Sequence, residues 1–535
     1  MNRRKFNQKL GTGAVFTIGW PFLGSCNGKK GRRDTRAAAV SQGFDPDVDL
    51  ELTAEEQIIS ILPGQKTKVW TFESRLISGK EDNLHKLEGS YLGPIIKVHR
   101  GQKIRIRFRN QLPEVSIVHW HGMHVPEQYD GHPKDVINTG ENYVYEFEVM
   151  NRAGTYWFHP HPDGRTGPQV YYGLAGLFLV TDEEEQYLTL PTGEFDVPVV
   201  IQDRTFDWDN QLVYLTQGHM ERMNGFLGDQ ILINGQANQT LRLKSGSVYR
   251  LRLLNGSNSR IYKLGWSDAR PVTVVGVDGG LLAAPREVPY LMLGPAERTD
   301  LWVDLREMDQ GNELIMNSLS FPSMELMGGR MGGRGMMGGK STSLPQSSRY
   351  PVFKIQISGT GSIDLHLPDQ LADDTPLSPS AAHNQHNPRT FTFPMQRMEW
   401  TINGRTWETY GVAEEEKVAL DSTEVWELVN SGSSGRRGGM RGGRGMMQMA
   451  HPIHLHQVQF NILSRNTDEV DPDLWDAVKE GFVDDGWHDT VLLLPGMRAR
   501  IIMTFKNYEG LFLYHCHNLE HEDMGMMRNF EIVAG

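Results

Sequence analysis

Near its C-terminus the chain reads Tyr514-His515-Cys516-His517-Asn518-Leu519-Glu520-His521-Glu522-Asp523-Met524-Gly525-Met526-Met527, which gathers a thiol, imidazoles and thioethers in one short segment. A blue-copper site uses two histidines, one cysteine and a weak axial methionine. Cys516, His521 and Met526 supply three of these four ligands. Neighbouring side chains of a β-strand point to opposite faces, so Cys516 would face one copper while His515 and His517 face other metals. The backbone at Cys516 would then join two metal centres directly.

Three further segments carry closely spaced histidines. They are His119-Trp120-His121-Gly122, Trp157-Phe158-His159-Pro160-His161 and His451-Pro452-Ile453-His454-Leu455-His456. Two rings separated by one residue leave the same face of an extended strand. His451 is an odd number of residues from His454 and His456, so an extended segment places it on the opposite face. This parity predicts that His451 joins Cys516, His521 and Met526.

The remaining imidazoles form a second predicted cluster with eight members. They are His119, His121, His159, His161, His454, His456, His515 and His517. Imidazole is a good ligand for copper, although zinc and iron also accept it. A structural zinc site takes four ligands, whereas the two predicted clusters together offer twelve. The size of the set therefore favours a copper cluster that binds O2 over a zinc site.

In type and order, the four segments resemble the four copper-binding motifs of the multicopper oxidases, a family that includes laccases, bilirubin oxidases and cuprous oxidases. The resemblance covers nearly the whole mature chain and implies four copper ions. It implies a type 1 copper on His451, Cys516, His521 and Met526, since the family spacing selects Met526 over Met524 and Met527. It implies a type 2 copper on His119 and His454. It implies a type 3 pair on His121, His159, His161, His456, His515 and His517. A copper nitrite reductase resembles this architecture but needs fewer imidazoles.

Short alternating runs bounded by turn residues, such as 103–108 and 143–149, indicate half-buried β-strands. The resemblance implies an all-β fold of three cupredoxin-like Greek-key barrels, which agrees with these runs. We predict domain one at 58–182, domain two at 195–358 and domain three at 389–535, with a linker at 359–388. Four of the eight clustered imidazoles come from 119–161 and four from 454–517, so the cluster should lie at the junction of domains one and three.

The formal net charge of −12 opposes binding to nucleic acid or to an anionic membrane.

Residues 1–26 resemble a twin-arginine signal peptide, with Arg3 and Arg4 before an apolar stretch that is too short and too rich in glycine to span a membrane. Leu23-Gly24-Ser25-Cys26 resembles a lipobox, which would leave a lipid anchor on Cys26; the alternative is cleavage after Ala39. Residues 27–57 would be a polar tether. These features predict export to the periplasm or cell envelope.

Two segments, an insertion at 324–340 and a loop at 432–449, are rich in methionine, glycine and arginine. Thioether sulfur favours Cu(I), so nine methionines are candidate ligands for Cu(I) as a substrate: Met324, Met327, Met331, Met336, Met337, Met440, Met446, Met447 and Met449. The alternative is a flexible linker with incidental methionines. Cuprous oxidases of this family have methionine-rich insertions, but in or just before the third domain. They also carry an aspartate where this chain has Met447.

By this resemblance, electrons from a donor enter at the type 1 copper, whose exposed edge should be His451 or His521, and pass through Cys516 to His515 and His517. Four such transfers reduce O2 to two waters. Proton transfer is assigned to two carboxylates, Asp130 and Glu522, although each is alternatively a structural acid. We predict an oxidase of Cu(I) and of phenolic donors. The alternatives are a laccase-type oxidase in which the methionine segments gate access, and copper storage or delivery without catalysis.

Overall fold

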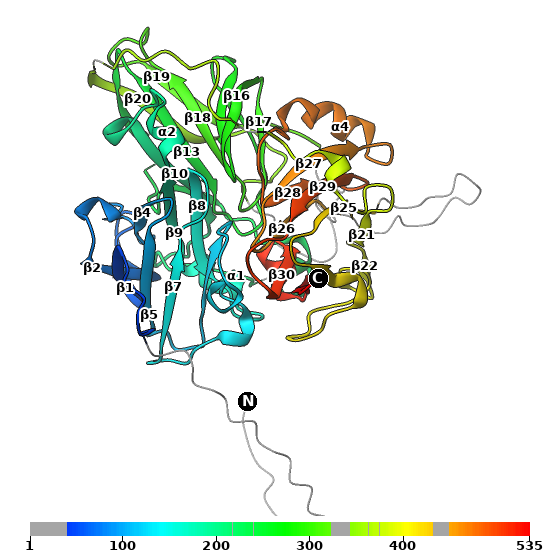
Figure 1. The fold of residues 1–535 in the computed structure, drawn as a ribbon. Coiled ribbons are helices and arrows are strands. Elements are labelled where there is room, and N and C mark those ends of the chain that lie inside the picture. Colours follow the sequence, from blue (N-terminus) through cyan, green and yellow to red (C-terminus); the bar gives the residue numbers. More distant parts are fainter. Residues whose placement is uncertain are drawn as a thin grey trace, which may run out of the picture. The chain divides into compact units, whose positions relative to one another are not determined.

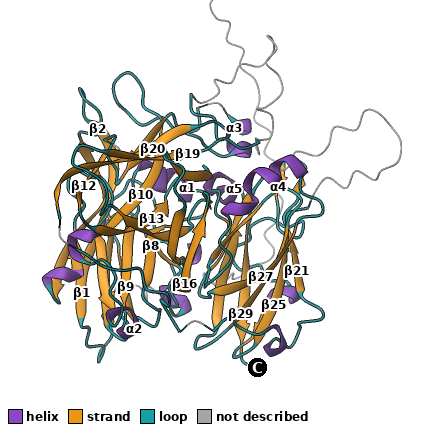
Figure 2. Ribbon diagram, turned by 90° about the horizontal axis from the view of Figure 1, so that it is seen from above, coloured by secondary structure: helices purple, strands orange, loops and turns teal. Residues whose placement is uncertain are grey.

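The computed structural model describes residues 40–535 apart from Gln217, Gln239, 323–342, Ser362, Asp374 and 432–448. The described residues belong to the unit Ala37–Gly535. They form an all-β fold, as predicted, in which short helices connect the strands (Figures 1 and 2). The strands fall into three consecutive groups of two main sheets each, which we call domains one, two and three.

Domain one consists of sheets β2-β1-β5-β7 and β3-β4-β9-β8-β6. Its strands are β1 Val48–Ile59, β2 Thr67–Ser78, β3 Leu84–His85, β4 Ile95–His99, β5 Lys103–Asn110, β6 Val118–His121, β7 Asn142–Glu148, β8 Gly154–Pro160 and β9 Gly176–Thr181. Its helices are α1 Thr166–Tyr172 and α2 Glu183–Gln186, with 3-10 turns η2 Glu81–Asn83, η3 Glu127–Tyr129, η4 Pro133–Asp135 and η5 Gly193–Phe195. The alternating run at 103–108 forms β5, with Ile104, Ile106 and Phe108 fully buried.

The first strand begins earlier than predicted, because β1 starts at Val48, within the residues 27–57 that were expected to form a polar tether. Leu50, Leu52 and Ala54 alternate along β1 and are fully buried. The strand pairs with β2 on one side and with β5 on the other. The part of the predicted tether between 48 and 57 is therefore a core strand, and its alternating apolar residues are the signal that the prediction overlooked.

Domain two consists of sheets β11-β10-β13-β18-β15-β16 and β12-β20-β19-β14-β17. Its strands are β10 Asp196–Arg204, β11 Gln230–Ile233, β12 Thr240–Ser245, β13 Val248–Asn255, β14 Tyr262–Trp266, β15 Val272–Val277, β16 Gly280–Val288, β17 Leu291–Leu293, β18 Arg298–Asp304, β19 Glu313–Ser318 and β20 Tyr350–Thr360. The helix α3 spans His219–Asn224.

Domain three consists of sheets β21-β25-β29-β27 and β24-β31-β30-β26-β28, with a small β22-β23 hairpin. Its strands are β21 Arg389–Thr392, β22 Met395–Gln396, β23 Glu399–Trp400, β24 Lys417–Ala419, β25 Thr423–Val429, β26 His451–Leu455, β27 Phe460–Asn466, β28 Thr490–Leu493, β29 Arg498–Thr504, β30 Gly510–Cys516 and β31 Met527–Val533. The helices are α4 Pro472–Val478 and α5 Leu519–Asp523, with 3-10 turns η6 Pro379–Ala381, η7 Glu414–Glu416 and η8 Lys479–Gly481.

The three domains repeat one topology. Each contains two parallel strand pairs among antiparallel ones: β1 with β5 and β4 with β9, β10 with β13 and β12 with β20, β21 with β25 and β24 with β31. In each domain both sheets turn buried apolar residues toward a shared core. The repetition is what three copies of one Greek-key barrel would produce.

Domains one and three meet where α1 lies beside α5 (Figure 2). The Asp523 carboxylate of α5 accepts hydrogen bonds from the backbone N–H groups of Thr166 and Gly167 at 2.9 and 3.0 Å. Domain two also reaches α5, because Tyr214 and Asn258 donate to the buried Glu520 carboxylate at 2.6 and 3.0 Å. All three domains therefore fix the position of this short helix.

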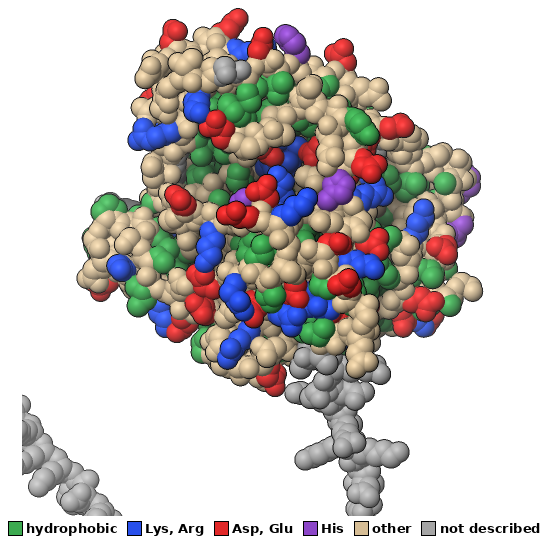
Figure 3. All heavy atoms as spheres, turned by 60° about the vertical axis from the view of Figure 1, so that its left-hand side comes forward, with side chains coloured by type: hydrophobic (Ala, Val, Ile, Leu, Met, Phe, Trp, Pro, Cys, Tyr) green, Lys and Arg blue, Asp and Glu red, His purple; other side chains and the backbone are tan. Residues whose placement is uncertain are grey.

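Acidic and basic side chains are interspersed on the face of the molecule drawn in Figure 3. The acidic excess of the whole sequence is thus not gathered into one patch on that face. Within the described part of the chain, no helix has the length and apolar character needed to cross a membrane.

Candidate metal centres

Two strand pairs bring the histidine segments together. In domain one, β6 pairs with β8 so that His119 lies opposite His159. In domain three, β26 pairs with β30 so that His454 lies opposite His515. Alternation along these strands sends one set of side chains toward domain one and leaves Cys516 on the other face.

The eight imidazoles form one buried cluster at the junction of domains one and three. Each ring is between 0 and 1% exposed. Their Nε2 atoms approach one another in pairs: His119 and His454 at 3.4 Å, His159 and His517 at 3.4 Å, His161 and His515 at 3.3 Å, and His456 and His515 at 3.1 Å. Facing nitrogens at these distances have the arrangement of a ligand set around metal ions.

Hydrogen bonds at the outer edge of the rings fix which nitrogen faces inward. Nδ1 contacts oxygen in five rings: His119 at 2.6 Å from the Asp130 carbonyl, His159 at 3.0 Å from the Pro160 carbonyl, His454 at 2.8 Å from the Asp489 carbonyl, His456 at 2.7 Å from the Asp130 carboxylate and His515 at 3.2 Å from the Cys516 carbonyl. An Nδ1–H that donates outward leaves the Nε2 lone pair free for a metal. These five rings are therefore oriented for coordination through Nε2.

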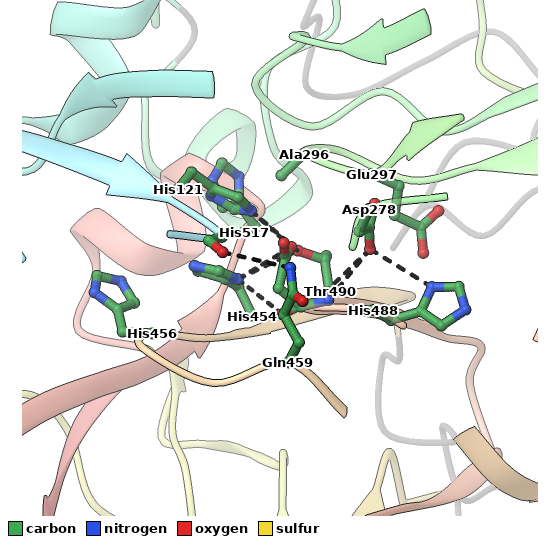
Figure 4. Close-up of polar contacts among 12 residues, drawn as sticks. His121, Asp278, Ala296, Glu297, His454, His456, Gln459, His488, Thr490 and His517 are labelled. Carbon is green, nitrogen blue, oxygen red and sulfur yellow. Dashed lines mark hydrogen bonds and ion pairs between the residues drawn. The ribbon is translucent and has the colours of Figure 1, made fainter. Parts of the chain in front are cut away.

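His121 has the opposite orientation. Its Nε2 lies 3.0 Å from Oδ1 of Asp489 and 3.2 Å from Oγ1 of Thr490, and its ring stacks on His454 at 3.6 Å (Figure 4). Its Nδ1 is buried and has no hydrogen-bond partner among the described residues. One nitrogen each from His119, His121 and His159 lie within 4.8 Å of one another. The unpartnered Nδ1 is thus where a metal ion would bind.

Burial also sets the charge of these rings. It lowers the pKa of six imidazoles well below the ordinary histidine value, and neighbouring rings lower it further: His121, His159, His161, His454, His456 and His517. Neutral imidazole is the form that binds metal. The site therefore presents uncharged nitrogen donors at neutral pH.

The second site surrounds Cys516. Its Sγ lies 3.4 Å from Nδ1 of His451 and 3.8 Å from Nδ1 of His521, and all three side chains are fully buried. Met526 is also fully buried, in the same hydrophobic cluster, and its carbonyl accepts the Cys516 N–H at 3.1 Å. Burial raises the pKa of the Cys516 thiol, so a metal would have to displace its proton. This set fits a copper ion with a thiolate ligand.

The prediction that His451 or His521 exposes an edge is wrong. Both rings are fully buried. Nε2 of His521 lies 2.9 Å from the Met223 carbonyl of α3, and the Trp400 ring packs against both imidazoles at centroid distances of 4.7 and 4.8 Å. Trp400 Nε1 donates to the same Met223 carbonyl at 3.2 Å. Domain two covers this edge, and nothing in the local sequence around either histidine signals that contact.

The two predicted proton-transfer carboxylates lie at the eight-histidine cluster. Asp130 is fully buried and contacts His456 and His119 as described above. The Glu522 carboxylate lies 3.1 Å from Nδ1 of His515 and 3.5 Å from Nε2 of His161. Each carboxylate therefore touches imidazoles of the cluster from a different side.

Sequence reasoning missed Asp489, although it contacts two rings of the cluster. The Asp489 carboxylate contacts Nε2 of His121, and the Asp489 carbonyl accepts a hydrogen bond from Nδ1 of His454. Arg298 of domain two forms an ion pair with the same carboxylate at 2.6 Å. Asp489 follows a lone histidine, His488, in a segment without any ligand motif. Only the pairing of β28 with β26 places it at the cluster.

Of the nine candidate methionines for Cu(I), eight lie outside the described residues: Met324, Met327, Met331, Met336, Met337, Met440, Met446 and Met447. Met449 is buried, and its carbonyl accepts from Asn430 at 2.7 Å. Phe321, just before the first methionine-rich segment, shares a hydrophobic cluster with Met449 and Cys516. The described residues Phe321 and Met449 thus belong to the same hydrophobic cluster as Cys516. The signal-peptide region, with Cys26, also lies outside the described residues.

Comparison with known proteins gives one consistent family. Three family models described as multicopper oxidase match residues 68–185, 196–328 and 380–535. A multicopper oxidase of Staphylococcus haemolyticus is 30% identical over 83% of each chain. The crystal structure of the multicopper oxidase McoA from Aquifex aeolicus is similar with a TM-score of 0.73 and 32% identity, covering 92% of this chain and 97% of that one. The cell division protein FtsP of Photorhabdus laumondii is also 30% identical, over 85% of each chain.

Proposed function

Because this chain belongs to the multicopper oxidases, we propose that it oxidises a small donor one electron at a time at Cys516 and reduces O2 to water at the eight-histidine cluster. Four bound copper ions would supply this redox chemistry. A type 1 copper would bind His451, Cys516, His521 and Met526. A type 2 copper would bind His119 and His454. A type 3 pair would bind His121, His159, His161, His456, His515 and His517. The observation that supports this most is the buried set of inward-facing imidazole nitrogens beside an isolated buried thiol.

The chain itself connects the two sites. Cys516 is bonded through the backbone to His515 and His517, whose rings lie on the opposite face of the segment in the eight-histidine cluster. Two covalent routes therefore lead from the thiol to this cluster. Burial of both sites excludes water from these routes and strengthens the electrostatic interactions along them.

We propose Cu(I) as the principal donor. The edge of His521 is covered by the Met223 carbonyl, which disfavours direct contact with a bulky phenol. The described ends of both methionine-rich segments, Phe321 and Met449, share the core of Cys516. Thioethers bind Cu(I) in preference to harder ions. A laccase-type activity toward organic donors is the alternative, with these segments gating access.

Two sets of variants separate these alternatives. Deletion of 324–340 together with 436–447 is expected to lower steady-state Cu(I) oxidation by about tenfold, the effect of losing roughly 1.4 kcal/mol of substrate binding. Replacing the methionines in these segments with leucine, at unchanged length, should give the same loss because only the thioether is removed. Oxidation of a phenol should not fall in either variant.

Other outcomes would assign a different role to the segments. If deletion raises phenol oxidation while the leucine variant changes neither rate, the segments gate an organic donor. If Cu(I) oxidation survives both changes, they do not bind the substrate.

We further propose that Asp130 and Glu522 deliver protons to O2 as it is reduced. Asp130→Asn is expected to slow reoxidation of the fully reduced enzyme by O2 about a hundredfold, the usual contribution of a general acid. Anaerobic reduction of the blue band should keep its rate, because Asp130 does not touch Cys516. Asparagine can still accept the His456 hydrogen bond, so copper content should be unchanged. Reoxidation at the wild-type rate would remove Asp130 from proton delivery.

The similarity to the cell division protein FtsP offers a second function, a role in cell division. The complete set of inward-facing histidines favours the oxidase, because a purely structural role does not need it.

We propose export through the twin-arginine-like segment at 1–26, with lipid attachment at Cys26 to a cell-envelope membrane.

Purified wild-type protein should be blue and contain about four coppers per chain. A copper-free, colourless protein after copper loading would count against the oxidase.

A further inference from the structure

Domain two contributes none of the twelve proposed copper ligands, yet one of its side chains contacts all three domains. Arg298, at the start of β18, is fully buried. Its Nη1 and Nη2 donate to the two carboxylate oxygens of Asp489 in domain three at 2.7 and 2.6 Å. Its Nε donates to the Thr155 carbonyl of domain one at 2.8 Å, and Nη2 also reaches the Asp278 carbonyl of domain two at 2.9 Å. One guanidinium thus joins the three domains at the eight-histidine cluster.

Asp489, the partner of Arg298, orients two histidines that are proposed to bind different coppers. Its carboxylate lies 3.0 Å from Nε2 of His121, and its carbonyl accepts from Nδ1 of His454. Thr490 Oγ1 lies beside both rings, at 3.2 Å from His121 and 3.3 Å from His454 (Figure 4). The two rings are nearly parallel, at 13°. The Asp489-Thr490 pair therefore fixes a stacked imidazole pair across the boundary between domains one and three.

The orientation of His121 depends on where the Asp489 carboxylate is held. Because Nε2 of His121 contacts Oδ1 of Asp489, Nδ1 of the same ring stays without a hydrogen-bond partner and is available to a metal. Arg298 holds this carboxylate through a two-pronged contact, which fixes the plane of the carboxylate group.

The surrounding backbone leaves room for this ion pair and for little else. Gly122, directly after His121, has a φ of +81°. A Cβ on Gly122 would lie 2.3 Å from Oδ2 of Asp489 and 2.9 Å from Nη2 of Arg298. Behind the pair, Asp278 accepts the Arg298 N–H at 2.7 Å and lies 3.6 Å from Nδ1 of His488 (Figure 4). The ion pair is therefore enclosed on both sides.

We propose that Arg298 is a positioning residue of domain two that holds His121 and His454 in their metal-binding orientation through Asp489. This inference rests on the proposed function, because it gives domain two a role at the copper cluster. Arg298 touches neither O2 nor a ligand nitrogen. It acts by holding the Asp489 carboxylate in place.

The test compares Arg298→Lys with Arg260→Lys in copper-loaded, full-length protein. Arg260 is a matched control because it is equally buried and pairs with Asp203 at 2.7 Å, but its contacts stay within domain two. Lysine keeps the positive charge but cannot make the two parallel hydrogen bonds of a guanidinium to a carboxylate. Copper per chain is measured by mass spectrometry. Cu(II) ions that are not magnetically coupled to another copper are detected by electron paramagnetic resonance. The Cys516 site is followed by the intensity of its blue absorption band.

Arg298→Lys is expected to change the eight-histidine cluster alone. Either the copper content falls below about three ions per chain, or it is unchanged and the two ions of the proposed type 3 pair become visible by electron paramagnetic resonance. The blue band should stay at wild-type intensity. Arg260→Lys should lower the thermal midpoint but leave copper content and both spectra unchanged. If Arg298→Lys does not fold, Gly122→Ala tests the same pair, because its Cβ would displace the Asp489 carboxylate while Arg298 remains.

Identical copper content and spectra in Arg298→Lys and Arg260→Lys would overturn the positioning role. Loss of the blue band together with cluster copper would also overturn it, since that pattern indicates general destabilisation. Wild-type protein that binds no copper would instead reject the proposed function, and this inference with it. The first two results leave the proposed function intact, so the two failures are distinguishable.

Discussion

Replacing Cys516 with serine is expected to abolish the blue absorption band and to lower O2 consumption with any donor to the background rate. The thiolate is both the soft ligand of the proposed type 1 copper and the start of both covalent routes to His515 and His517. Serine fills nearly the same space, so the fold should remain. Absorption spectra, O2 consumption and copper per chain check this result, with about three coppers expected to remain.

The chain provides a matched control for this experiment, because Cys26 is its only other cysteine. Cys26→Ser should keep the blue band and the O2 consumption of the wild type. A blue band that survives Cys516→Ser, or O2 consumption at the wild-type rate in that variant, would refute the assignment of Cys516.

Removing copper should make the stability of the protein strongly dependent on pH. Burial lowers the folded-state pKa of ten histidines, namely His121, His124, His132, His159, His161, His451, His454, His456, His517 and His521. The pKa falls to about 4 for His132 and to about 3 for His521. Unfolded histidines titrate near pH 6.5. The unfolded state therefore binds more protons as the pH falls below 6.5, and stability is lost in that direction.

The expected size of this effect is large because many rings act together. Between its unfolded-state and folded-state pKa values, each ring lowers the free energy of unfolding by up to about 1.4 kcal/mol for every pH unit of acidification. Urea unfolding of copper-free protein should thus show a midpoint that drops steeply from pH 6.5 to pH 5 and changes less from pH 8 to 6.5. Copper-loaded protein should show a smaller drop, because a metal-bound nitrogen takes no proton until the metal leaves. Equal midpoints of copper-free protein at pH 8 and pH 5 would contradict this explanation.

Local sequence was sufficient to predict the fold class and the grouping of the histidines. Strand alternation alone separates His451 from His454 and His456, and the structure places His451 beside Cys516. That inference succeeds because the side-chain period of a strand does not depend on distant contacts. The same rule, applied to 48–59, would have moved the first strand ahead of residue 58.

Contacts between distant segments could not be predicted in this way. Arg298 and Asp489 are 191 residues apart, and His521 and Met223 are 298 residues apart. Of these four residues only His521 lies in a histidine motif, and each contact depends on how domain two packs against the others. The sequence therefore indicated which residues gather in the two candidate metal centres but not which residues cover them. The exposed edge wrongly expected at His451 or His521 has this cause.

The eight-histidine cluster takes four imidazoles from 119–161, on and directly after β6 and β8, and four from 454–517. The whole of domain two lies between these two halves of the donor set. A ribosome must therefore synthesise domains one and two and most of domain three before any such centre can assemble. A fragment that ends before residue 454 would carry at most four of the eight donors.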